Sequence, residues 1–200
     1  MNAIPDEKYP DAHHDQYSKT VFGFWVYILT DFILFGTLFA VYAVLKKSVF
    51  GGTPAHVLFE LPYNLWQSLI LLVSATTIGI GGVYAHRNQM GKTAFFFIVT
   101  FILGAIFFGM GFAEFARFVA SGNSWQNSAF LSAYFSLVGT HAGHICFGLL
   151  WIILIMIQMF KEGVNPVTLR RLTCMRMFWQ FLNIIWIFIF TIVYLMGEIQ

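Results

Sequence analysis

Charged residues are scarce in this chain, and their scarcity excludes an ordinary water-soluble domain. Asp, Glu, Lys and Arg together make up 10% of the 200 residues, whereas soluble domains typically carry about 25%. Apolar residues make up 58%, phenylalanine occurs 24 times, and the mean hydropathy is +0.74. We therefore expect an integral membrane protein. The sequence has no basic block, so nothing in it predicts a nucleic-acid partner.

Cysteine is also scarce. Cys146 lies in an apolar stretch that is expected to be a helix, and Cys174 in a basic stretch that is expected to be a loop, so their expected depths in the membrane differ too much for easy bridging. We expect two free thiols and no disulfide framework. No CxxC, CxxCH or zinc-type spacing occurs, so the sequence has none of the common signatures of a c-type haem or a structural zinc site.

Five apolar stretches are long enough to span a hydrocarbon layer, which takes roughly 20 residues. Residues 1–20 are polar and do not resemble a cleaved signal peptide, so they are expected to form a cytoplasmic tail. Residues 21–200 are expected to form a single all-α transmembrane domain, a five-helix bundle. The predicted spans are about 21–45, 65–84, 93–113, 129–160 and 177–197.

The distribution of Lys and Arg predicts the orientation of the bundle. Eight of the eleven lie in the tail and in the connections that follow the second and fourth spans. Because positive residues favour the cytoplasmic side, the N-terminus is expected inside and the C-terminus outside. Some of these cations are candidates for contact with anionic lipid headgroups at the inner face: Arg87, Arg170, Arg171 and Arg176.

Four ionisable residues lie within the predicted spans: Asp31, Glu114, His141 and His144. Such groups are costly inside a membrane and by default mark a site or a buried partner. Asp31 is expected roughly 15 Å from the inner surface at 1.5 Å per residue, a depth comparable to that of the two histidines. It is either paired with one of them or neutral and bonded to a local carbonyl. Glu114 is ordinarily explained by an i,i+3 pair with Arg117.

The histidines do not predict a cofactor. A bis-histidine haem in a bundle needs ligands on facing helices, but both deep histidines lie on one predicted helix. No Cys, Met and His set is spaced for copper. We expect no catalytic residue, no metal and no redox cofactor in this chain. Three glycines at small-residue spacings are expected to allow close packing, within the chain or against another subunit: Gly109, Gly139 and Gly143.

Several stretches together resemble a known family. They are GFWVYILTDFILFGTLFAVYAVL in the first span, FELP at 59–62, Glu114 with Phe115, LVGTHAGHICFGLLW in the fourth span and WQFLNIIWIFIFTIVYLMG in the fifth. In this order and spacing they resemble subunit III of haem–copper terminal oxidases, most closely the five-helix form of cytochrome o (bo-type) ubiquinol oxidases. Gln180 and Asn183 stand where relatives commonly have His and Asp, and Gly111 where many have a second acidic residue.

The resemblance implies an accessory subunit in a bacterial cytoplasmic membrane. Haem b, haem o and copper are expected in subunit I, with subunits II and IV and phospholipid as further partners. Asp31, Glu114, His141 and His144 become candidates for a buried polar cluster that lines a lipid cleft. Two related alternatives stay open, a cytochrome c oxidase and a nitric oxide reductase. From a different class, a proton- or ion-coupled transporter is opposed by the odd number of spans.

Overall fold

Five long helices make up most of the chain. In the computed structural model the described residues are 12–46, 48, 61–122, 125–163 and 165–199, so residues 1–11 of the expected tail lie outside them. The helices are α1 (Ala12–Leu45), α3 (Leu61–His86), α4 (Met90–Ala120), α5 (Ala129–Glu162) and α6 (Pro166–Ile189). A π-helical segment, η1 (Phe190–Leu195), continues α6 into the short α7 (Met196–Ile199).

All five long helices are long and apolar enough to cross a membrane, and the fifth span runs from Pro166 through Leu195. The expected all-α, five-span bundle is therefore confirmed, and the chain is a multi-pass membrane protein. Residues 12–20 of the expected tail are helical and form the first turns of α1.

The fifth helix begins eleven residues before the expected start at 177. The basic stretch that contains Arg170, Arg171 and Cys174 is helical, so the prediction that Cys174 lies in a loop was wrong. The Asn165 side chain accepts a hydrogen bond from the backbone N–H of Thr168 at 2.8 Å, and Pro166 occupies the first turn. Both are standard helix-start features.

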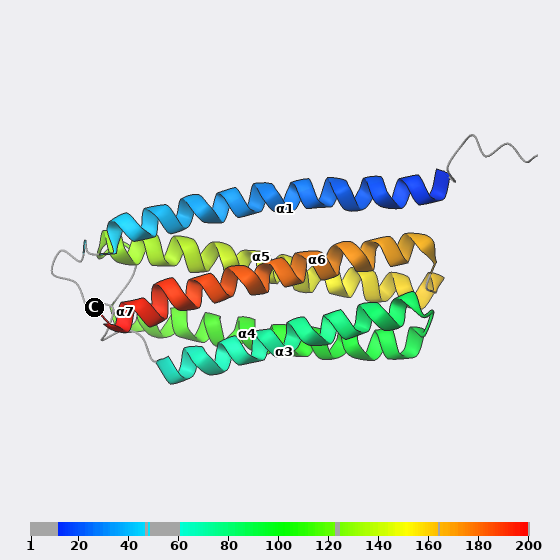
Figure 1. Ribbon diagram of the computed structural model, residues 1–200. Coiled ribbons are helices and arrows are strands. Elements are labelled where there is room, and N and C mark those ends of the chain that lie inside the picture. The colour runs from blue at the N-terminus through cyan, green and yellow to red at the C-terminus, as the bar shows by residue number, and fades with distance from the viewer. Residues whose placement is uncertain (1–11, 47, 49–60, 123–124, 164, 200) are drawn as a thin grey trace, which may run out of the picture.

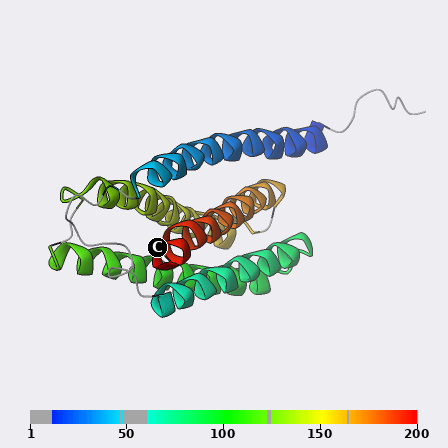
Figure 2. The same ribbon diagram turned by 60° about the vertical axis from the view of Figure 1, so that its left-hand side comes forward.

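The helices form three layers (Figure 1). α1 lies on one side, α5 and α6 form the middle, and the α3–α4 hairpin lies on the other side, an arrangement that also holds in the turned view of Figure 2. α6 is the central element: it contacts α1, α3 and α5. Half of the residues in its membrane-spanning stretch are buried within the chain, compared with 22% of those in the corresponding stretches of α1 and α4.

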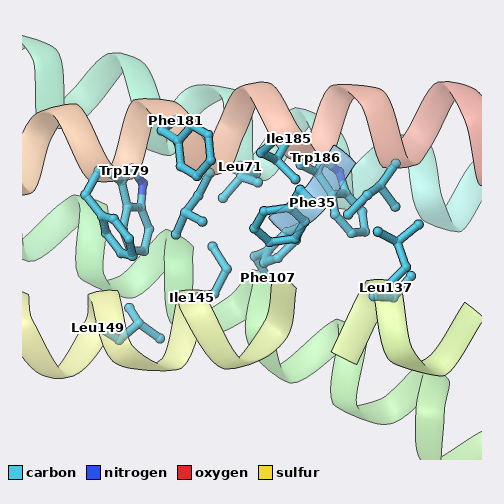
Figure 3. Close-up of a cluster of buried hydrophobic side chains, with 14 of the residues drawn as sticks. Phe35, Leu71, Phe107, Leu137, Ile145, Leu149, Trp179, Phe181, Ile185 and Trp186 are labelled. Carbon is cyan, nitrogen blue, oxygen red and sulfur yellow. The ribbon is translucent and has the colours of Figure 1, made fainter. Parts of the chain in front are cut away.

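Aromatic side chains of α6 fill the centre of the bundle. Figure 3 shows Trp186 near Phe35 and Phe107 of neighbouring helices, and Trp179 earlier in α6, above Leu149 of α5. The rings of Phe107 and Trp186 meet edge-on, with centroids 4.7 Å apart, a favoured aromatic geometry. The outer faces are apolar as well; Phe22, Ile33 and Leu154, for example, are each more than 60% exposed. That pattern is expected of a chain whose solvent is lipid.

Two glycines make room for the Trp179 indole. A Cβ at Gly104 would lie 2.7 Å from Trp179 Cη2, and one at Gly148 would lie 2.9 Å from Cζ3. Both distances are shorter than real carbon contacts, so a side chain at either position would displace the ring or a helix. The indole therefore fixes the spacing of α4, α5 and α6.

Candidate functional site

Asp31 and His144 face each other across the α1–α5 interface. Asp31 is 8% exposed, and its Oδ2 lies 3.8 Å from His144 Nε2. His144 Nδ1 lies 2.8 Å from the carbonyl oxygen of Thr140, one turn earlier. A carbonyl only accepts, so Nδ1 carries the proton, and Nε2 of a neutral ring presents its lone pair to Asp31.

The 3.8 Å separation is within ion-pair range but too long for a hydrogen bond. Among the described residues, Asp31 Oδ2 has no hydrogen-bond partner. Phe35, one turn further along α1, lies beneath both histidine rings, with centroids 5.2 Å from His144 and 6.3 Å from His141. Phe35 has no exposed surface and keeps the pair apart from the interior of the bundle.

His141 points away from Asp31, toward α6. Its Nε2 lies 3.1 Å from the carbonyl oxygen of Leu182, so Nε2–H is the donor. The ring is 1% exposed and packs against Trp186, with centroids 5.3 Å apart, and against Phe107, at 6.0 Å. Two histidines three positions apart thus serve different interfaces.

Glu114 belongs to a hydrogen-bonded chain with two tyrosines. It is 2% exposed, and its Oε2 accepts a hydrogen bond from the Tyr194 hydroxyl at 3.1 Å. The hydroxyls of Tyr134 and Tyr194 lie 3.0 Å apart; because Tyr194 donates to Glu114, Tyr134 is the donor to Tyr194. Tyr194 lies in η1, and π-helical turns are often found at functional sites. The i,i+3 interface explanation missed this interior network.

The four expected polar residues therefore form two groups. Asp31 and His144 lie between α1 and α5. Glu114 and His141 both line a small cavity between α3, α4, α5 and α6. Gln67, which is 1% exposed, lines the same cavity. The sequence did not single it out, because an uncharged polar residue in an apolar helix gives only a weak signal.

Two of the three glycines expected at helix contacts have open space beside them within the described chain. A Cβ at Gly109 or Gly143 would meet nothing within 4 Å, whereas one at Gly139 would be in ordinary contact with Phe115 of α4, at 4.0 Å. Close packing of Gly109 and Gly143 against another subunit stays a prediction. The closest approaches are at Gly104 and Gly148, which the spacing rule did not single out.

The four candidate arginines lie at one end of the bundle, where α3 ends and α6 begins (Figure 1). Arg87 and Arg171 are exposed, and Arg170 and Arg176 are half-buried. Arg171 donates a hydrogen bond to the Gln158 side chain. A Cβ at Gly82 would lie 3.0 Å from both Cδ and Nη1 of Arg176, so the guanidinium end of that arginine packs against α3 near its C-terminus.

Neither histidine of α5 is arranged to hold a haem. Both lie on α5, and their rings face different helices: Nε2 of His141 bonds the Leu182 carbonyl of α6, and Nε2 of His144 faces Asp31 of α1, so the two cannot ligate one haem from opposite sides. In the part of the chain that the structure describes, no group of three or more His, Cys, Asp or Glu could hold a metal ion. The side chains present do not fit a resident haem or copper centre.

Several oxidase subunits are similar to this chain over most of its length. A Pseudomonas aeruginosa protein named cytochrome bo(3) ubiquinol oxidase subunit 3 is 45% identical over 189 residues, 94% of this chain and 90% of the relative. A Pseudomonas putida protein of the same name is 42% identical over 184 residues, 92% of this chain and 89% of the relative. The chain belongs to the oxidase subunit 3 family. The resemblance found from the sequence motifs is thereby confirmed.

The family also includes a subunit that is named for a cytochrome c oxidase. A protein from Bacillus sp. PS3, named cytochrome c oxidase subunit 3, is 39% identical over 178 residues, 88% of this chain and 86% of the relative. No protein-family model matches the chain. Membership of an oxidase subunit 3 family ties this chain to a multi-subunit oxidoreductase.

Proposed function

We propose that this chain is the non-catalytic subunit 3 of a proton-pumping haem–copper ubiquinol oxidase. The observation that carries the proposal is the 45% and 42% identity, over at least 92% of the chain, to two subunits named for ubiquinol oxidases. Haem b, haem o and copper are assigned to subunit I. The side chains of this subunit support that assignment, since its two deep histidines lie on one helix and face different neighbouring helices.

The proposed role of the chain is to support assembly and to sustain proton uptake by subunit I. Its partners are subunits I, II and IV of the complex and membrane phospholipid. Lipid headgroups are proposed to contact Arg87, Arg170, Arg171 and Arg176, since these cations gather at one end of the bundle, where anionic lipid would be attracted. The Asp31–His144 pair closes the α1–α5 interface and is not a catalytic site.

The proposed location is a bacterial cytoplasmic membrane, with the N-terminus inside and the C-terminus outside. The supporting observation is that Arg87, Lys92, Lys161 and the α6 arginines lie at the same end of the five helices. A cytochrome c oxidase is the second candidate, favoured by the 39% identity to a subunit of that name. The identities to the two ubiquinol oxidase subunits are three to six percentage points higher.

The experiment that tests the proposal is purification in a gentle detergent through a tag on this chain. We expect a complex whose reduced-minus-oxidised optical spectrum shows b- and o-type haem and whose oxygen uptake is driven by ubiquinol. Uptake driven only by reduced cytochrome c would keep the family and replace the complex with the second candidate. A haem-free protein that purifies alone would overturn both, and would direct attention to ion transport through Asp31 and His141.

A further inference from the structure

The cavity between α3, α4, α5 and α6 has room for one water molecule. Measured to the centre of a water-sized sphere, its volume is about 20 Å³. A single buried water needs roughly 10–15 Å³ by the same measure, together with two to four polar partners. The polar side chains that line it come from three helices: Gln67 of α3, Glu114 of α4 and His141 of α5.

Gln67 supplies an acceptor that no described residue uses. Its side chain is 1% exposed, and its Nε2 donates weakly to the carbonyl of Phe107 at 3.4 Å. Its Oε1 is buried and has no hydrogen-bond partner among the described residues. Because an unpaired amide oxygen is unfavourable in an apolar interior, the occupant of the cavity is expected to be a hydrogen-bond donor.

His141 supplies a second acceptor. Its Nε2–H donates to the Leu182 carbonyl, so Nδ1 of the neutral ring carries a lone pair. No hydrogen bond joins this Nδ1 atom to another of the described residues. Glu114 completes the set with a carboxyl group whose Oε2 already accepts from Tyr194. Two acceptors and one carboxyl group occupy three of the four bonding positions of a water molecule, within the two to four partners that a buried water needs.

We propose that the cavity is a specific water-binding site, and that the bound water joins Glu114 and His141 into one proton-sharing pair. With the proton on the Glu114 carboxyl, that group donates to the water, and the water donates to Gln67 Oε1 and His141 Nδ1. When the proton passes to the water and a water proton passes to Nδ1, the result is a Glu114 carboxylate and a His141 imidazolium. The net charge of the pair is the same in both arrangements.

The other titratable side chains near the pair do not line the cavity. Trp186 covers it from α6, and Tyr194, which donates to the Glu114 carboxyl, accepts a hydrogen bond from Tyr134. Arg117, one turn after Glu114, is exposed. His144, about one turn further along α5 than His141, faces Asp31 at the α1–α5 interface. The site belongs to this chain alone and does not depend on which electron donor the complex uses.

The direct test is a density map of the assembled complex at a resolution where ordered water is seen around neighbouring side chains. We expect a single peak within hydrogen-bond distance of Gln67 Oε1 in the unaltered protein and in Gln180→Leu, a matched control on the exposed face of α6. The peak should be lost in Gln67→Leu. An empty cavity in the unaltered protein, elongated density of an acyl chain, or a peak that persists in Gln67→Leu would each overturn the proposal.

A second variant covers the case in which Gln67→Leu does not assemble. A Cβ at Gly111 would lie 3.2 Å from Gln67 Nε2, so Gly111→Ala narrows the cavity and keeps all polar groups. The readout is the infrared carbonyl band of Glu114, assigned by its loss in Glu114→Gln. We expect this band to shift in Gly111→Ala and in His141→Gln and to stay in place in Gln180→Leu. An unchanged band in both cavity variants would show that no water links Glu114 to His141.

Discussion

The indole nitrogen of Trp179 donates a hydrogen bond to Ser74 Oγ at 2.9 Å, which joins the middle of α6 to the middle of α3. Both residues are fully buried. The same ring occupies the space left by Gly104 and Gly148, so one side chain sets the relative position of four helices. The bundle depends on this contact because lipid supplies no hydrophobic force to hold helices together.

The Trp179 contact predicts that Gly148→Ala and Gly104→Ala weaken the bundle. Each added methyl group would overlap the indole, and overpacking of this kind costs about 1–3 kcal/mol. The measurement is the thermal midpoint at which the tagged chain leaves the purified complex, which we expect to fall for both variants.

Gly109→Ala and Gly143→Ala are the matched controls, since their methyl groups would meet nothing within 4 Å in this chain. Unchanged midpoints are expected if both positions face lipid. A reduced yield of complex with a normally folded chain would instead place them at a contact with another subunit. Equal destabilisation by all four substitutions would contradict the role given to Trp179.

The Asp31–His144 pair predicts that Asp31→Asn assembles and leaves the initial oxidase rate nearly intact. Asn keeps the size of the side chain and can donate to His144 Nε2, so the α1–α5 interface is preserved. We expect the Asp31→Asn complex to lose oxygen uptake faster than the unaltered complex during continuous turnover.

Asp31→Leu is the companion variant, because it removes the carboxyl group that lies 3.8 Å from His144 Nε2. It should reduce the amount of assembled complex more than Asp31→Asn does. Immediate loss of most turnover in fully haem-loaded Asp31→Asn complex would show that the pair takes part in the reaction itself.

The Tyr194–Glu114 bond predicts that Tyr194→Phe destabilises the packing of η1 against α4. Removal of one partner of a buried hydrogen bond costs roughly 1–3 kcal/mol when the other partner is left unsatisfied. Thermal release of the chain from the complex measures the change. Tyr84→Phe is the control: Tyr84 stacks on Phe96 with centroids 5.5 Å apart, and that contact does not use the hydroxyl. If the two substitutions had the same effect, the hydrogen bond would contribute nothing.

The sequence was sufficient for the features that depend on length and composition. Five runs of apolar residues predict five spans, and a rise of 1.5 Å per residue places Asp31 and the α5 histidines at similar depth. The start of α6 was missed although its signal was present: Asn165 followed by Pro166 is a cap and first turn. The basic residues that follow were interpreted as a loop because they are not apolar, but a helix can extend beyond the hydrocarbon layer.

The features that depend on which face of a helix meets which neighbour were not predictable from spacing. Gly109 and Gly104 are both small residues on α4, and only the position of Trp179 makes Gly104 the contact. Gln67 is an uncharged residue in an apolar run, and its importance depends on a cavity formed by three other helices. The spacing of residues in the sequence does not specify which neighbouring helix each side chain contacts.

The orientation of the bundle leads to a labelling prediction. Gln89 and Gln126 are exposed residues in the connections that follow α3 and α4, respectively. If the N-terminus is cytoplasmic, a membrane-impermeant maleimide should modify Gln126→Cys in intact spheroplasts and Gln89→Cys only after the membrane is opened. Cys146→Ala and Cys174→Ala supply a background without native thiols. The opposite labelling pattern would invert the topology, and would place Arg87 and the arginines of α6 on the outer face, where the positive-inside rule does not place them.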